Sequence, residues 1–183
     1  YLYQAYDFTL DEANQAIHLT NTDLVLKSKQ LYSHLKYAKQ IVLLAATLGI
    51  EVERQVRRYE FSEMTKAFVL DSACVDYIEK ICDLAEVDID AQFPDCVLNR
   101  RFSPGYGDLS LEIQPQFLKT LGADRLLGLT LTENYLMIPR KSITAILGLF
   151  EDDKVARPRR KPSKNLTINM VKTGNFNVMG VTP

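Results

Sequence analysis

A continuous apolar run, "IVLLAATLGI" from Ile41 to Ile50, constrains the fold of this chain more than any other stretch. It contains β-branched residues, and Gly49 ends the strand pattern. Such a run is typical of a strand buried on both faces. The run is about half as long as a membrane span. With 46% apolar and 25% charged residues, the chain has the composition of an ordinary soluble domain. We therefore expect a buried strand within a globular core.

Helical patterns precede this strand. Residues 9–12, "TLDE", have the form of a capping box, with a hydroxyl at the N-cap and a carboxylate three residues later. They predict a first helix that ends near His18. Ser28 is placed to cap a second, shorter helix that carries Leu31 and Leu35.

Two further helices are expected after the strand. Val52, Val56 and Tyr59 fall on one face of a charged helix, and residues 63–87 repeat apolar groups at helical spacing. The second of these is the longest helix that we predict. Residues 88–94 are acidic and end at a proline, which indicates a turn.

Sequence patterns in the C-terminal half of the chain predict further strands. Residues 96–102 form a short strand, and Ser110 and Pro115 suit the first turn of a helix that runs to Gly122. Three apolar segments follow, and their links are too short for crossover helices, so we expect antiparallel neighbours. These segments are "LLGLTLT", "NYLMIP" and "SITAILGLF".

Together these patterns predict an α+β fold, a single domain with a mainly antiparallel mixed sheet covered by helices. We place that globular domain at residues 1–152. Residues 153–183 are expected to form a basic, flexible C-terminal tail, because residues 154–164 hold six Lys and Arg with two prolines and no acid.

Charge and cysteine content narrow the functional classes. The net charge is −1, whereas nucleic-acid binders carry a pronounced excess of Lys and Arg, so we expect neither a nucleic-acid nor a membrane partner. Cys74, Cys82 and Cys96 are odd in number and lack CxxC spacing, which argues against both a disulfide framework and a zinc site. A reducing, cytoplasmic setting fits these thiols best.

Common catalytic motifs are missing from the sequence. The two histidines, His18 and His34, each fall on a predicted helix, and neither stands beside a Ser or Cys in a nucleophile motif. A P-loop, a GxGxxG fingerprint and an HExxH motif are also missing. We therefore predict no catalytic residue and no metal ligand.

The stretch "RRFSPGYGD", residues 100–108, has the most chemical content. Pro104 restricts the backbone, while Gly105 and Gly107 allow positive φ and leave the peptide groups accessible to a ligand. Arg101 offers a planar fork that matches a carboxylate, and Tyr106 combines an aromatic face with a hydroxyl.

Two interpretations of this stretch remain open on the residues alone. It fits a site for an amino-acid-like ligand, with the carboxylate on Arg101, backbone contacts from Ser103, Pro104 and Gly105, and an apolar part against Tyr106. It also fits a strand-to-helix turn whose arginine pairs with a surface acid, the interpretation that the residues alone favour.

A family resemblance adds to this reading. Residues 101–149 resemble the reactivation domain that binds S-adenosylmethionine (AdoMet) at the C-terminus of cobalamin-dependent methionine synthase, and they are more similar still to the small stand-alone members of that family. Residues 44–53 and 71–73 are also similar to the stand-alone group. The resemblance covers roughly residues 40–150. Gly107 and Asp108 stand where the full-length synthases continue with proline.

The resemblance implies a role in methionine biosynthesis as part of a methyltransferase system. It implies that Arg101, Ser103, Pro104, Gly105 and Tyr106 bind AdoMet, and that the chain supports reductive methylation of inactive cobalamin. Cobalamin would be carried by a partner, a corrinoid protein or the other modules of methionine synthase, because the Asp-x-His-x-x-Gly motif that ligates cobalt is missing here. A reductant such as a flavodoxin or ferredoxin would supply the electron.

An alternative stays open within the same resemblance. The chain would then be a non-catalytic module of this fold that docks on a corrinoid protein or binds another amino-acid-like ligand.

Overall fold

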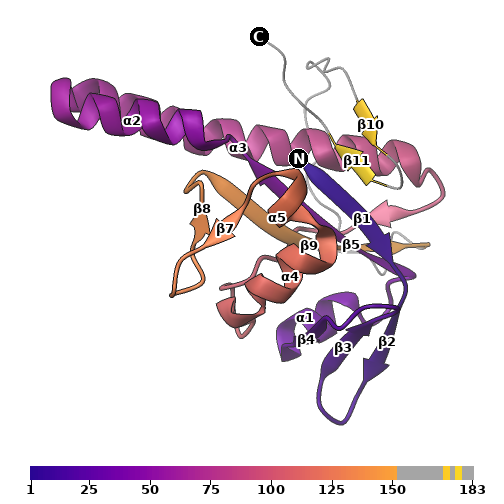
Figure 1. The fold of residues 1–183 in the computed structure, drawn as a ribbon. Helices are drawn as coiled ribbons and strands as arrows, with labels where there is room; N and C mark the ends of the chain where they lie inside the picture. The colour runs from indigo at the N-terminus through magenta and orange to yellow at the C-terminus, as the bar shows by residue number, and fades with distance from the viewer. Residues whose placement is uncertain (152–170, 174–175, 179–183) are drawn as a thin grey trace.

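An antiparallel sheet of six strands forms the centre of the structure, a computed structural model that describes residues 1–151, 171–173 and 176–178 (Figure 1). The strand order is β10-β11-β1-β5-β9-β6. β5 (Gln40–Thr47) lies between β1 and β9, and residues 41–46 within it are buried, which confirms the strand that the apolar run predicts. The other strands are β1 (Leu2–Tyr6), β6 (Val97–Leu98), β9 (Ser142–Phe150), β10 (Val171–Thr173) and β11 (Phe176–Val178).

The side chains of β5 alternate between two cores, one on each face of the sheet. Its odd-numbered positions 41–45 face the core beneath α1 (Lys29–Leu35) and α4 (Gln114–Leu121). Its even-numbered positions 42–46 face the core beneath α3 (Met64–Gln92). Helices therefore cover both faces of an antiparallel sheet, which confirms the expected α+β class and the single domain.

A second sheet replaces the first expected helix. The helix predicted to end near His18 is wrong, because the chain forms a hairpin there, with β2 paired to β3 and β3 to β4. Asp11 accepts a hydrogen bond from the Asn14 backbone N–H at 3.0 Å, so a side chain suited to capping closes a turn instead. The strands of this sheet are β2 (Phe8–Asp11), β3 (Ala16–Leu19) and β4 (Val25–Lys27).

The short helix α1 forms as predicted. The Ser28 hydroxyl accepts a hydrogen bond from the Leu31 N–H at 2.9 Å, the usual geometry of an N-cap. Leu31 and Leu35 are both buried in the core that α1 shares with α4. His34 does lie on this helix, whereas the other histidine lies on β3.

A helical hairpin forms from α2 (Ile50–Ser62) and the first half of α3, and the second half of α3 packs on the other face of the sheet (Figure 1). Glu63 separates the two helices, with φ −151° and ψ 82°. α3 continues through residue 92, so the turn expected at residues 88–94 is wrong over most of its length. The helix persists because Ile89 is fully buried and the Tyr3 hydroxyl donates to Gln92 Oε1 at 2.9 Å.

The three apolar segments near the C-terminus do not form one meander. β7 (Thr130–Leu131) and β8 (Met137–Ile138) pair as expected, but β9 leaves them and pairs with β5 over eight residues. The expectation that the second and third segments are neighbours is therefore wrong. Pairing with the long, buried β5 satisfies far more backbone groups than pairing with the two-residue β8.

The remaining elements connect this framework. The predicted helix ending at Gly122 is confirmed, and that glycine takes the left-handed conformation that commonly ends a helix. Two short helices lie before and after α4, namely η1 (Leu111–Ile113) and α5 (Ala123–Leu126). Within the expected tail, β11 pairs with β1, whereas the basic run at residues 154–164 lies outside the described residues. Among the described helices, none is long and apolar enough to cross a membrane.

Because β9 packs closely against α1, we expect substitution of Gly148 by a larger residue to destabilise the protein. A Cβ added there would lie 2.6 Å from the Phe150 ring and 2.9 Å from Leu35 Cδ2. We expect Gly148→Ala to lower the free energy of unfolding by about 1–3 kcal/mol, because an overpacked core must shift. Urea denaturation measures this. Thr65→Ala, at an exposed position of α3, is the control, and equal stability of both variants would contradict the packing argument.

Candidate functional site

Residues 103–106, which follow Arg101, form a type II β-turn whose residue types favour that geometry. The Tyr106 N–H donates to the Ser103 carbonyl at 3.1 Å, which closes a four-residue turn. Pro104 occupies the second position and Gly105, at φ 86°, the third. Proline favours the φ of the second position, and only glycine readily takes positive φ at the third. The residues that suggested a ligand site therefore also have a structural reason to be there.

The turn is anchored to the edge of β9. The Phe102 N–H donates to the Ile146 carbonyl at 2.9 Å, and the Ile146 N–H donates back to the Phe102 carbonyl at 2.8 Å. Because strand residues alternate with period two, the backbone groups of Thr144 point toward the same edge as those of Ile146. Beyond the bridge, no described strand pairs with this edge of β9. A short stretch of this sheet edge, beside the turn, thus has no strand partner among the described residues.

Gly107 and Asp108 dock the turn on α1. Gly107 has φ 58°, which a proline cannot adopt, and an added Cβ would overlap the Gln30 side chain. Asp108 accepts hydrogen bonds from the Ser28 hydroxyl and from the Lys29 N–H at 2.8 Å. Glycine at position 107 therefore fits both the backbone conformation and the close approach of this turn to α1.

Arg101 reaches the opposite face of the sheet, where α3 presents three acids. Its guanidinium lies 2.8 Å from Glu86, 2.9 Å from Glu79 and 3.2 Å from Asp83. The arginine thus pairs with acids, as the structural interpretation of the turn expects. The Glu86 side chain is only 5% exposed, so the ion pair is largely desolvated. Removal of one partner from such a pair is strongly destabilising.

Electrostatics around Arg101 are dominated by the acids. Burial alone would lower the pKa of Arg101, but the nearby carboxylates, Glu86 above all, raise it beyond its ordinary value. With three carboxylates around one guanidinium, the ionised cluster has an excess of two negative charges. Among the described residues, no group of His, Cys, Asp and Glu side chains is arranged to hold a metal ion.

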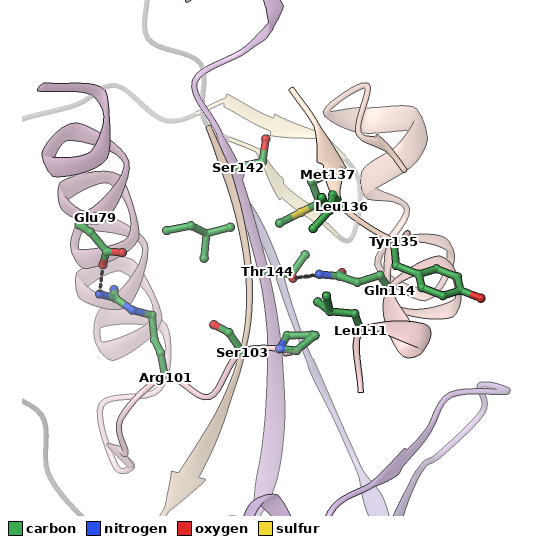
Figure 2. A pocket seen from close by; sticks show the side chains of 12 residues that line it. Glu79, Arg101, Ser103, Leu111, Gln114, Tyr135, Leu136, Met137, Ser142 and Thr144 are labelled. Atoms are coloured by element: carbon green, nitrogen blue, oxygen red, sulfur yellow. Dashed lines mark hydrogen bonds and ion pairs between the residues drawn. The ribbon is translucent and has the colours of Figure 1, made fainter. Parts of the chain in front are cut away.

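A cavity of about 280 Å³ opens beside this cluster (Figure 2). Its lining brings together three of the five predicted site residues, Arg101, Ser103 and Pro104. Tyr106 lines a different cavity on the α1 side, and Gly105 is not among the residues that line either one. The other residues of the first cavity come from α3, η1, the start of α4, the β7–β8 hairpin and β9, and include Glu79, Leu111, Gln114, Leu136, Met137 and Thr144.

A buried polar pair lies in the wall of this cavity. Gln114 and Thr144 are each 2% exposed, and the Gln114 amide donates to Thr144 Oγ1 at 2.9 Å (Figure 2). The amide nitrogen and oxygen of Gln114 can each make a further hydrogen bond. An amide and a hydroxyl at such a position can orient a polar ring within an otherwise apolar wall.

Sequence reasoning missed several of these residues. Glu79, Asp83 and Glu86 stand at i, i+4 and i+7, so an acidic stripe on one face of the long helix was readable from the sequence. No comparable local signal marks Gln114 or Thr144, which meet only because the fold brings the start of α4 beside β9.

The comparisons with known proteins do not add to this picture. No family model matches the chain, and no curated protein matches it either. The chemistry of the site and the resemblance of its motif must therefore carry any functional assignment.

The anchor between the turn and α1 predicts a pH dependence. The hydrogen bond from Ser28, and then those from the backbone of Lys29 and Gln30, lower the pKa of Asp108 below its ordinary value of 3.8. A carboxyl with a lowered folded-state pKa stabilises the protein above its unfolded pKa, and this contribution is lost as the pH falls through the folded pKa.

We expect Asp108→Asn to have a lower melting temperature than the parent protein at pH 7. Below pH 3.8, we expect the difference between the two melting temperatures to become smaller. Melting curves across pH measure this difference. The control is Asp76→Asn, at an exposed position of α3. A difference that stays constant down to pH 2 would rule out an ionised Asp108 as the anchor.

Proposed function

We propose that this chain binds AdoMet in the cavity beside Arg101 and supports reductive methylation of cobalamin held by a separate corrinoid protein. The observation that carries the proposal is the shared lining of that cavity by a guanidinium and a carboxylate, Arg101 and Glu79, within a cluster of net negative charge. The resemblance of residues 101–149 to the reactivation domain of methionine synthase supports the same ligand.

The charges of AdoMet match those of the cavity. AdoMet carries an α-carboxylate, an α-ammonium and a sulfonium, so its net charge at neutral pH is positive. Arg101 would bind the carboxylate and Glu79 the ammonium, each through a charge-assisted hydrogen bond. The excess of negative charge from Asp83 and Glu86 would favour the sulfonium by a longer-range attraction.

The rest of the cavity suits the nucleoside part of AdoMet. Pro104, Leu136 and Met137 supply apolar surface, while Gln114 and Thr144 supply hydrogen-bonding groups. The edge of β9 beside the turn adds backbone donors and acceptors to the same wall. This combination of an apolar lining with a few fixed polar groups is the usual composition of a small-molecule site.

The chain needs no general base for this role. Reductive methylation moves one electron from a reductant and the methyl group of AdoMet onto the cobalt, and it releases S-adenosylhomocysteine. The protein positions AdoMet with its methyl group toward the corrin and excludes competing reactions. A flavodoxin or ferredoxin would supply the electron in a cytoplasmic setting, where Cys74 and Cys82 remain free thiols.

The proposal predicts that the affinity for AdoMet depends on both members of the ion pair, Arg101 and Glu79. We expect Arg101→Ala to weaken binding by about 1.5–3 kcal/mol, the scale of a hydrogen bond to a charged group. Isothermal titration calorimetry measures the change. Because Arg101 also supports the fold, Glu79→Gln provides a second variant at a half-exposed position, and we expect it to weaken binding as well. Asp76→Asn, on the same helix, is the matched control.

Unchanged affinity in both Arg101→Ala and Glu79→Gln would reject this cavity as the AdoMet site. It would favour the alternative of a non-catalytic module that docks on a corrinoid protein.

The proposed activity predicts a spectroscopic result. We expect a mixture of this chain, its corrinoid partner in the Co(II) state, AdoMet and reduced flavodoxin to develop the absorption spectrum of methylcobalamin. Omission of AdoMet or of the chain should leave the Co(II) spectrum unchanged. No spectral change with a partner that binds the chain would overturn the proposal.

A further inference from the structure

The turn separates two cavities. The second cavity, of about 520 Å³, lies on the α1 side of residues 103–106. α1 contributes Lys29, Gln30, Ser33 and His34 to its lining, and the segment before the turn contributes Arg100, Arg101 and Phe102. Arg101 therefore lines both cavities, while its guanidinium pairs with the acids of α3. Tyr106, which does not line the AdoMet cavity, lies here.

This second cavity carries the opposite charge. Lys29 and Arg100 line it, and neither forms an ion pair within the part of the chain that the structure describes. No Asp or Glu is among its lining residues. The nearby Asp108 is engaged by Ser28 and by the α1 backbone. Two uncompensated cations in a concave site favour an anionic ligand.

The same cavity has an aromatic wall. The Phe102 ring is buried and packs edge-on against Tyr106, with ring centroids 5.4 Å apart, and the His34 ring centroid lies 5.8 Å from that of Phe102. Tyr106 is 67% exposed, so much of its ring remains available to a ligand. His34 is held by a hydrogen bond of 2.8 Å from Nε2 to the Arg100 carbonyl. Such a supported, accessible aromatic ring can stack on a planar ligand.

Hydrogen-bonding groups complete the lining. Ser33 follows Lys29 by one helical turn, so the hydroxyl and the ammonium lie on the same side of α1. A phosphate accepts hydrogen bonds from hydroxyl, ammonium and guanidinium donors together.

We propose that this second cavity is a binding site for a nucleoside phosphate, with the planar base against Tyr106 and the phosphate on Lys29 and Arg100. The site does not depend on the proposed AdoMet function. AdoMet is a cation and belongs to the acidic side of the turn, whereas this ligand is an anion and belongs to the basic side.

Calorimetry with adenosine monophosphate (AMP) tests this site. We expect AMP to bind, adenosine and inorganic phosphate each to bind more weakly, and the affinity for AMP to fall as salt is raised. The double variant Lys29→Gln/Arg100→Gln should bind AMP about tenfold more weakly or worse, because two charge-assisted contacts are lost. The matched control is Lys119→Gln/Arg125→Gln, which removes two exposed cations from another surface. We expect its affinity for AMP to be unchanged.

The position of AMP is tested separately from AdoMet binding. Amide chemical shifts should change with AMP in residues 29–34 and 100–106, and AdoMet should not displace AMP. Absence of AMP binding, competition between AMP and AdoMet, or equal loss of AMP affinity in the two double variants would each overturn the proposal. Loss of AdoMet binding in Glu79→Gln with AMP binding retained would leave it standing.

Discussion

Burial of β5 on both of its faces is the constraint from which the rest of the structure follows. A strand with apolar side chains at six consecutive positions, residues 41–46, needs cover above and below, and it needs hydrogen-bonding neighbours on both edges. α3 supplies one cover, α1 and α4 supply the other, and β1 and β9 supply the edges. The segment of β9 nearest its start extends past the described strand β6 on its outer edge, and the cavity beside Arg101 forms at this extension.

Arg101 joins the fold to this cavity. It lies between β6 and Phe102, which both pair with β9, and its side chain reaches the acids of α3 on the far face. The ion pairs fix the arginine and hold the turn against the helix. The same ion pairs give the cavity its negative character, because the acids outnumber the single guanidinium. A group that supports the fold can thus also define the charge of a ligand that the site accepts.

The turn after Arg101 separates two environments of opposite sign. Its type II geometry places Ser103 and Pro104 on the acidic side and Tyr106 on the basic side. Asp108 then ties the end of the turn to α1. A turn anchored at both ends can present different side chains to two cavities without moving. The conformations required of Gly105 and Gly107 therefore explain the sequence of the turn independently of any ligand.

Local chemistry in the sequence determined the buried strand β5, the capped helix α1, the hairpin helices α2 and α3, and the proline–glycine turn. In each of these, the periodicity, the cap or the φ preference acts within a few residues. Only the tertiary structure decided that residues 9–18 form a hairpin, that the last turn of α3 persists, and that β9 pairs with β5 rather than β8. The site follows the same division. Arg101 and its turn were visible in the sequence, whereas the meeting of Gln114 with Thr144 and the split of the turn between two cavities depend on packing between distant segments, which no local pattern encodes.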